Sequence, residues 1–192
     1  MNTYTIDLNS IGKVTDDNFY LLCRRNPELK LELNAQGGLI IMSPTGGETG
    51  NRNAELIVEF GIWNRQAKLG KIFDSSTYFK LPNGAKFSPD VAWIKLARWQ
   101  QLSPQSRVKF PPIAPDFVLE LMSPSDSLVA TQAKLNEYIE NGVKLGWLIN
   151  PQTRQVEVYR LGKAKEVLDN PQSLSGEDVL PGFILDLQIV WG

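Results

Sequence analysis

Two acidic residues stand in strands that are otherwise apolar. Glu120 interrupts the run Phe117-Val118-Leu119-Glu120-Leu121-Met122, and Asp90 follows Pro89 and opens the apolar run 91–94. A carboxylate buried in such a strand is costly unless a metal, a cation or a proton compensates its charge. A hard divalent cation shared by Asp90 and Glu120 would neutralise both acids. For either acid alone, a capped turn or a buried ion pair is the competing explanation.

Asp116 and Lys134 are the other charged candidates. Asp116 falls on the same face of the expected strand as Glu120, but the proline-rich segment before it favours a strand-entry role. Lys134 lies on the helix expected after Glu120, at the border of its apolar face. Border lysines commonly extend their ammonium groups into water, and Tyr138, one turn later, is more often a packing residue. A chemical role for Lys134 therefore depends on its neighbours in the fold.

The composition excludes several kinds of chemistry. None of the 192 residues is histidine, which removes Ser-His-Asp and Cys-His hydrolases and zinc sites of the Cys/His type. The 20 basic and 21 acidic residues nearly cancel, so any nucleic acid must be bound by a local patch. Cys23 is the single cysteine, and no stretch has the pattern of a membrane span or a secretory signal, so we expect a cytoplasmic protein that does not enter membranes.

The N-terminal part is expected to form a helix and a β-hairpin. Thr15 supplies a capping hydroxyl and Asp16-Asp17 lie at the positive end of the helix dipole, so a helix should run from here to about 26–27. Residues 29–33 then alternate apolar and polar side chains, and the turn Gln36-Gly37-Gly38 leads into the apolar run 39–42, which is typical of a hairpin.

The remaining elements place the candidate residues on a sheet and a helix. A long helix should run from the Gly-rich stretch 44–50 to about Lys68, closed by Gly70. A second helix is expected at 128–141, where apolar residues recur on one face. Strands are expected at 71–73, 77–81, 91–94, 117–122, 145–149 and 155–160, with a helical turn at 96–102 and a last strand near 180–185 that packs on the sheet edge. The pattern predicts one α/β (α+β) domain with a mixed central sheet flanked by helices.

The order and spacing of several blocks resemble a known family. These blocks are Ser88-Pro89-Asp90-Val91-Ala92-Trp93-Ile94, residues 114–125, Lys134-Leu135-Asn136-Glu137-Tyr138, Asn141-Gly142-Val143 and Gly146-Trp147-Leu148-Ile149-Asn150-Pro151. They are similar to the Uma family of restriction endonucleases, which resembles the PD-(D/E)XK nuclease superfamily. The resemblance covers almost the whole chain. It implies a single restriction-endonuclease-like domain over 1–192, with the N-terminal helix and hairpin at 1–43 and the nuclease-like core at 44–192.

The resemblance implies a role for each candidate residue. Asp90 corresponds to the aspartate of the Pro-Asp motif and Glu120 to the second acid, so both would bind Mg²⁺ or Mn²⁺, with a backbone carbonyl of Leu121 or Met122 as a further ligand. Met122 occupies the usual place of the lysine, which in this family is displaced onto the next helix, where Lys134 stands. The implied reaction is hydrolysis of DNA phosphodiester bonds, in which the metal acidifies water and Lys134 orients that water or stabilises negative charge.

Relatives often carry a histidine near the start of the long helix, where this chain has Glu48-Thr49-Gly50-Asn51. Glu48, or Glu55 further along, would be an additional metal ligand, although surface or capping roles fit both equally well. Restriction-like enzymes are often dimers, so the analogy also predicts a homodimer.

Two other functions are compatible with the same residues. The first is a catalytically inactive nuclease fold that serves as an interaction module, which the near-neutral charge favours. The second is a glycoside hydrolase that uses Asp90 and Glu120 as its carboxylate pair. Its sugar rings would stack on tryptophans, for which the candidates are Trp63, Trp93, Trp99 and Trp147.

Overall fold

The predicted N-terminal helix and hairpin are both present in the computed structural model, which describes residues 4–8, 12 and 14–192. Helix α1 (Asp16–Arg25) begins at Thr15, whose hydroxyl accepts a hydrogen bond from the amide of Asn18 at 3.2 Å. Strands β2 (Lys30–Leu33) and β3 (Gly38–Met42) form the hairpin. They belong to a five-stranded sheet of order β1-β3-β2-β6-β5, in which β1 is Tyr4–Asp7, β5 is Phe79–Lys80 and β6 is Lys86–Phe87.

The central sheet has six strands in the order β11-β10-β9-β8-β7-β4. Their bounds are β4 Gly70–Asp74, β7 Val91–Lys95, β8 Phe117–Leu121, β9 Leu145–Asn150, β10 Gln155–Arg160 and β11 Glu166–Asp169. Among these described strands β8 and β9 run parallel, and helix α5 (Leu128–Glu140) connects them, as a parallel pair requires. The mixed sheet predicted from the sequence is therefore confirmed.

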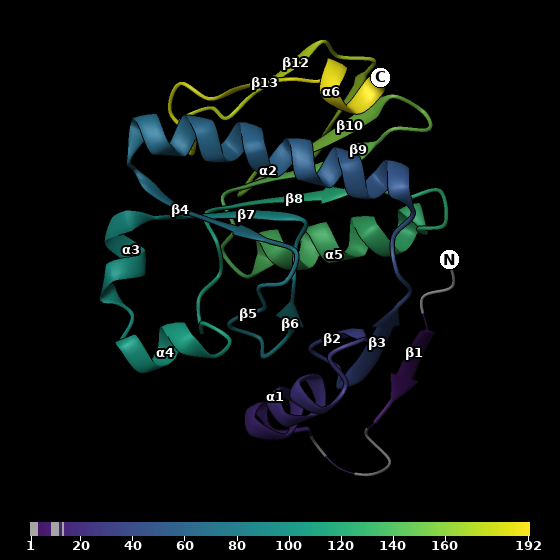
Figure 1. The fold of residues 1–192 in the computed structure, drawn as a ribbon, viewed down its shortest axis with the longest axis vertical. Helices are drawn as coiled ribbons and strands as arrows, with labels where there is room; N and C mark the ends of the chain where they lie inside the picture. The colour runs from purple at the N-terminus through teal and green to yellow at the C-terminus, as the bar shows by residue number, and fades with distance from the viewer. Residues whose placement is uncertain (1–3, 9–11, 13) are drawn as a thin grey trace.

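Helices cover both faces of the central sheet. The long helix α2 (Gly47–Ala67) lies on one face and α5 on the other (Figure 1), and the short helices α3 (Leu96–Gln101) and α4 (Pro104–Val108) follow β7. Within the described ranges, no helix combines the length and the apolar character of a membrane span.

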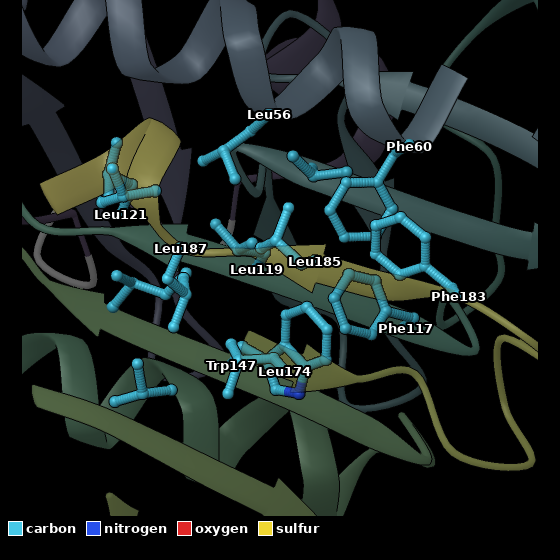
Figure 2. Packing of buried hydrophobic residues seen from close by; sticks show 14 of the residues in the cluster. Leu56, Phe60, Phe117, Leu119, Leu121, Trp147, Leu174, Phe183, Leu185 and Leu187 are labelled. Carbon is cyan, nitrogen blue, oxygen red and sulfur yellow. The ribbon is translucent and has the colours of Figure 1, made fainter. Parts of the chain in front are cut away.

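Successive residues of β8 face different cores. Phe117 and Leu119 pack with Phe60 of α2 in the larger apolar cluster, part of which Figure 2 shows. Val118 packs with Tyr138 of α5 in a second cluster. Because side chains alternate along a strand, Glu120 projects toward the α5 side together with Val118. The strand is buried on both faces, as its apolar sequence predicts.

The C-terminal segment differs from its prediction. It forms β13 (Ile184–Asp186), which pairs with β12 (Ser173–Ser175) in a separate two-stranded sheet, followed by α6 (Gln188–Trp191). Instead of extending the edge of the central sheet, this segment inserts Leu185 and other apolar side chains into the cluster beneath α2. The terminal segment therefore closes the core on the α2 side.

The end of α2 also differs from its prediction. Lys68, and not Gly70, adopts the left-handed conformation that terminates the helix, with φ of 56°. Gly70 begins β4 and is required for another reason. A Cβ atom there would lie 2.3 Å from Cε2 of Trp93 and 2.4 Å from the carbonyl oxygen of Ile94.

We expect Gly70→Ala to destabilise the protein by about 2 kcal/mol or more, because the methyl group would force β4 away from β7. Gly61→Ala is the matched control, since a Cβ at Gly61, inside α2, would lie 3.8 Å from the guanidinium of Arg65. The control should stabilise the protein by about 0.5–1 kcal/mol through helix propensity. Urea denaturation measures both changes, and equal effects of the two substitutions would contradict the close packing of Gly70.

Candidate active site

A cavity of about 760 Å³ lies among the N-terminal hairpin, the end of β8, the start of α2 and one side of α5. Asp90, Glu120 and Lys134 all line it. The structure therefore brings the three candidate residues into one cavity from a loop, a strand and a helix.

Strand register explains why the two acids are neighbours. Strands β7 and β8 are antiparallel, with Val91 opposite Leu119. The next position in this register sets Asp90 against Glu120, and residues directly opposite on adjacent strands have Cβ atoms about 5 Å apart. The carboxylate of Asp90 also accepts a hydrogen bond from the amide of Leu121 at 2.9 Å, which fixes it beside the strand that carries Glu120.

Lys134 is buried against two carboxylates. Its Nζ lies 2.8 Å from Oε1 of Glu120 and 2.9 Å from Oε1 of Glu32, and only 15% of its side chain is exposed. The hydroxyl of Tyr138, one turn along α5, donates to Oε1 of Glu120 at 3.2 Å. Lys134 therefore does not extend into water, as a lysine at the border of an apolar face commonly does.

Burial raises the pKa of both acids, and the charge of Asp90 adds to the effect at Glu120. Burial is the main reason that the pKa of Glu120 rises to about 7; Lys134 opposes this rise and the charge of Asp90 adds to it. Burial also raises the pKa of Asp90, although Lys30, 4.0 Å away, and the amide of Leu121 oppose the change. Burial would lower the pKa of Lys134, but Glu120 and Glu32 outweigh it and raise that pKa, so the ammonium stays charged. A second cation near the two acids would relieve their repulsion.

The oxygen atoms around Asp90 fit a hard cation. Asn53 of α2 donates its Nδ2 hydrogen to Asp90 at 3.4 Å, while its Oδ1 is buried and accepts no hydrogen bond from the described residues. Two carboxylates and an amide oxygen are ligand types that Mg²⁺ accepts, usually with water and substrate oxygens completing its shell. Across residues 4–8, 12 and 14–192, no three His, Cys, Asp or Glu side chains cluster in a way that would hold a metal.

Asp116, the rival acid, does not line this cavity. It precedes β8 at the opposite end of the strand from Glu120 and is buried among cations, with Lys144 at 2.8 Å and Arg98 at 2.9 Å. It also accepts a hydrogen bond from the amide of Lys95 at 2.9 Å. Burial would raise the pKa of Asp116, but these partners outweigh it and hold the pKa below its usual value. These contacts favour the strand-entry role predicted for Asp116.

The other candidates lie away from the cavity lining. Glu48 is largely exposed and lies 4.0 Å from Arg52, and Glu55 is exposed. The tryptophans that would stack on sugar rings are instead packing residues. Trp93 and Trp147 are buried in the core, Trp63 packs against that core, and Trp99 packs against Phe73. None of these residues lines the cavity.

The polar residues next to the candidate acids and lysine include Lys30, Glu32 and Asn53, which the sequence did not single out. The alternation in the first hairpin strand assigns Lys30 and Glu32 to its polar face, which an isolated hairpin would turn to solvent. In the folded chain this face meets the end of β8 and α5. A charged pair on a hairpin strand is the only signal that the sequence offers, and such pairs are common on solvated faces.

Comparisons with known proteins identify a family and a structural neighbour. A family model described as "Uma2: Putative restriction endonuclease" matches residues 16–188. A solved structure of a protein from Anabaena variabilis ATCC 29413, described as "a putative nuclease belonging to DUF820", matches with a TM-score of 0.73. The match covers 85% of this chain and 90% of that chain at 20% identity, so the likeness concerns the fold alone. A search of curated proteins gave no match.

We expect Asp116→Asn to destabilise the protein by about 2 kcal/mol at neutral pH, since it removes the charge from a buried ion-paired group. Because the pKa of Asp116 is lower in the folded than in the unfolded chain, its contribution is complete above its ordinary value of 3.8 and is lost as the pH falls through the folded value. The stability difference between wild type and Asp116→Asn should therefore shrink in acid. Denaturant unfolding at several pH values measures it, with the exposed Asp178→Asn as control. A difference that is the same at pH 7 and in acid would contradict the ion-paired role.

Proposed function

Because the chain belongs to the Uma2 family, which is described as "Putative restriction endonuclease", we propose that it is a metal-dependent endonuclease that hydrolyses phosphodiester bonds of DNA. The observation that carries this proposal is the geometry of the cavity. Glu120 of β8 is buried, and Asp90, which directly precedes β7, exposes only 13% of its side chain beside it. A charged lysine lies 2.8 Å from Glu120. A homodimer and a cytoplasmic location remain predictions from the sequence.

The charge of the cavity supports a role for a divalent cation. The charged residues that line it are Glu32, Asp90, Glu120, Asp126 and Glu137 on the acidic side and Lys30 and Lys134 on the basic side. A phosphodiester carries negative charge, and both lysines already face carboxylates. The substrate could therefore approach the acids only with additional positive charge in the cavity.

Asp90 and Glu120 would hold this cation, with Oδ1 of Asn53 available as a neutral ligand. When bound, Mg²⁺ or Mn²⁺ would supply positive charge to the phosphoryl oxygens and lower the pKa of water. Tyr138 fixes the orientation of Glu120 through its hydrogen bond. Lys134 would donate hydrogen bonds to the attacking water or to a phosphoryl oxygen, and its ammonium would stabilise the negative charge that develops there.

The second candidate function is an inactive nuclease fold that binds a partner. The pairing of both cavity lysines with carboxylates favours it, because neither lysine is left unpaired to bind a phosphate. Metal binding separates this function from the endonuclease, since an inactive module has no requirement for a cation between Asp90 and Glu120.

We expect Mg²⁺ or Mn²⁺ to stabilise the folded protein, because only the folded chain assembles the two acids. At a metal concentration of 100 times the Kd the gain would be about 2.7 kcal/mol. Thermal melts with and without metal measure the gain, and a chelator should reverse it. Asp90→Asn and Glu120→Gln should remove most of it, whereas Glu48→Gln, at an exposed acid outside the cavity, should retain it. Melting temperatures that do not respond to either metal would favour the inactive module.

We also expect metal-dependent cleavage of DNA that needs the lysine. Lys134→Met should reduce the cleavage rate about 10²-fold or more, as the loss of other preorganised charge stabilisers does. Asp90→Asn should reduce it at least as much. Plasmid and oligonucleotide cleavage with purified variants measures both, and Glu48→Gln again serves as control. If Asp90→Asn and Lys134→Met cleave as fast as the wild type, the assignment of the site is wrong.

A further inference from the structure

Glu32 is a buried acid that the proposed reaction does not use. It lies on β2 of the N-terminal hairpin, which belongs to a different sheet from Glu120 and from β7, the strand that Asp90 precedes. Only 2% of the residue is exposed. Its Oε1 accepts two hydrogen bonds, from Nζ of Lys134 at 2.9 Å and from the amide of Ser88 at 2.8 Å. One carboxylate oxygen thus contacts both the lysine and the segment that leads into Asp90.

The ammonium of Lys134 is enclosed on several sides. Glu120 and Glu32 provide the two carboxylate contacts, and Nζ lies 5.6 Å from the ring centroid of Phe87 and 5.8 Å from that of Tyr138. Both distances are within the range of cation–π attraction. The position of the ammonium is therefore determined by Glu32 as much as by Glu120.

The carboxylate of Glu120 cannot bind Lys134 and a metal ion equally strongly at the same time. A metal cation bound to Glu120 is attracted by the same carboxylate charge that holds the ammonium of Lys134 at 2.8 Å. The metal cation also repels that ammonium. Without another anion, Lys134 would either leave the cavity or displace the cation from Glu120. Glu32 is the anion that remains available to the lysine.

We propose that Glu32 is a positioning residue, which holds the ammonium of Lys134 in the cavity while Glu120 binds the metal. This inference rests on the proposed function, because it concerns the site with metal bound. It gives the N-terminal hairpin a direct part in the site. Through the amide of Ser88, the same carboxylate also holds the Ser88-Pro89-Asp90 segment against the hairpin.

The test is a double-mutant cycle on Mn²⁺ affinity, which needs no substrate. The Kd for Mn²⁺ is measured by titration calorimetry or electron paramagnetic resonance in the wild type, Glu32→Gln, Lys134→Met and the double variant. Glu32→Gln should weaken binding about tenfold, because Lys134 then pairs with Glu120 alone and competes with Mn²⁺. In the double variant this competitor is absent, so most of the lost affinity should return. Lys134→Met alone should change the affinity much less than it does in the Glu32→Gln background.

Two further variants control this measurement. Glu137 lines the same cavity, but its carboxylate accepts a hydrogen bond from the side chain of Asn83 at 2.8 Å. Glu137→Gln removes one negative charge from the cavity and should change the Kd less than twofold. Glu32→Asp keeps the charge and should retain more affinity than Glu32→Gln. If Glu32→Gln does not fold, as its melting curve and circular dichroism would reveal, Glu32→Asp with and without Lys134→Met replaces it in the cycle.

Each outcome separates the positioning role from its alternatives. If Glu32 acts only through the charge of the cavity, the effects of Glu32→Gln and Lys134→Met on the free energy of Mn²⁺ binding should be additive. If Glu32 has only a structural role, Glu32→Gln should lower the melting temperature and leave the Kd for Mn²⁺ unchanged. Either result would overturn the inference. If the wild type itself does not bind Mn²⁺, the proposed function fails and the positioning role fails with it. Wild-type binding with an additive cycle refutes the role of Glu32 alone.

Discussion

An ammonium group held between two buried carboxylates links the two larger sheets of this protein. Lys134 belongs to α5, Glu120 to the central sheet and Glu32 to the N-terminal hairpin. Each charge would be costly to bury alone, and removal of one partner from such a cluster commonly destabilises a protein by about 3–5 kcal/mol. The three elements must therefore dock so that the ammonium lies between the two carboxylates. The same three side chains line the cavity. Stability and the proposed chemistry thus depend on the same contacts.

The lysine on α5 makes the site depend on helix docking. Met122 follows β8 where a lysine on the strand would stand, and it packs in the cluster beneath α5. Lys134 reaches Glu120 because α5 lies close to the sheet. Gly146 of β9 allows this approach, since a Cβ there would lie 2.8 Å from Cδ1 of Leu135. Gly146 on β9 therefore contributes to the position of the Lys134 ammonium in the cavity.

Much of the fold follows from local sequence, and the rest depends on long-range packing. The capping hydroxyl of Thr15 and the apolar face of 128–140 identify their helices, and the apolar run around Glu120 identifies a strand buried on both faces. The convergence of Asp90 and Glu120 follows from the strand register, which a single sequence does not reveal. Glu32 lies on the polar face of an alternating strand, and its burial arises only when the hairpin meets α5. The sequence carries no local signal for the partner of the last strand, so the packing of this strand in the same apolar cluster as α2 could not be predicted.

A crystal soaked in Mn²⁺ tests the central claim most directly, because anomalous scattering locates the metal without any assumption about activity. We expect a peak within coordination distance of Asp90 and Glu120, with Lys134 still paired to Glu32. A peak absent from this cavity in a crystal that binds Mn²⁺ elsewhere, or a Lys134 side chain turned away from both acids, would contradict the assignment of these residues to a metal-dependent site.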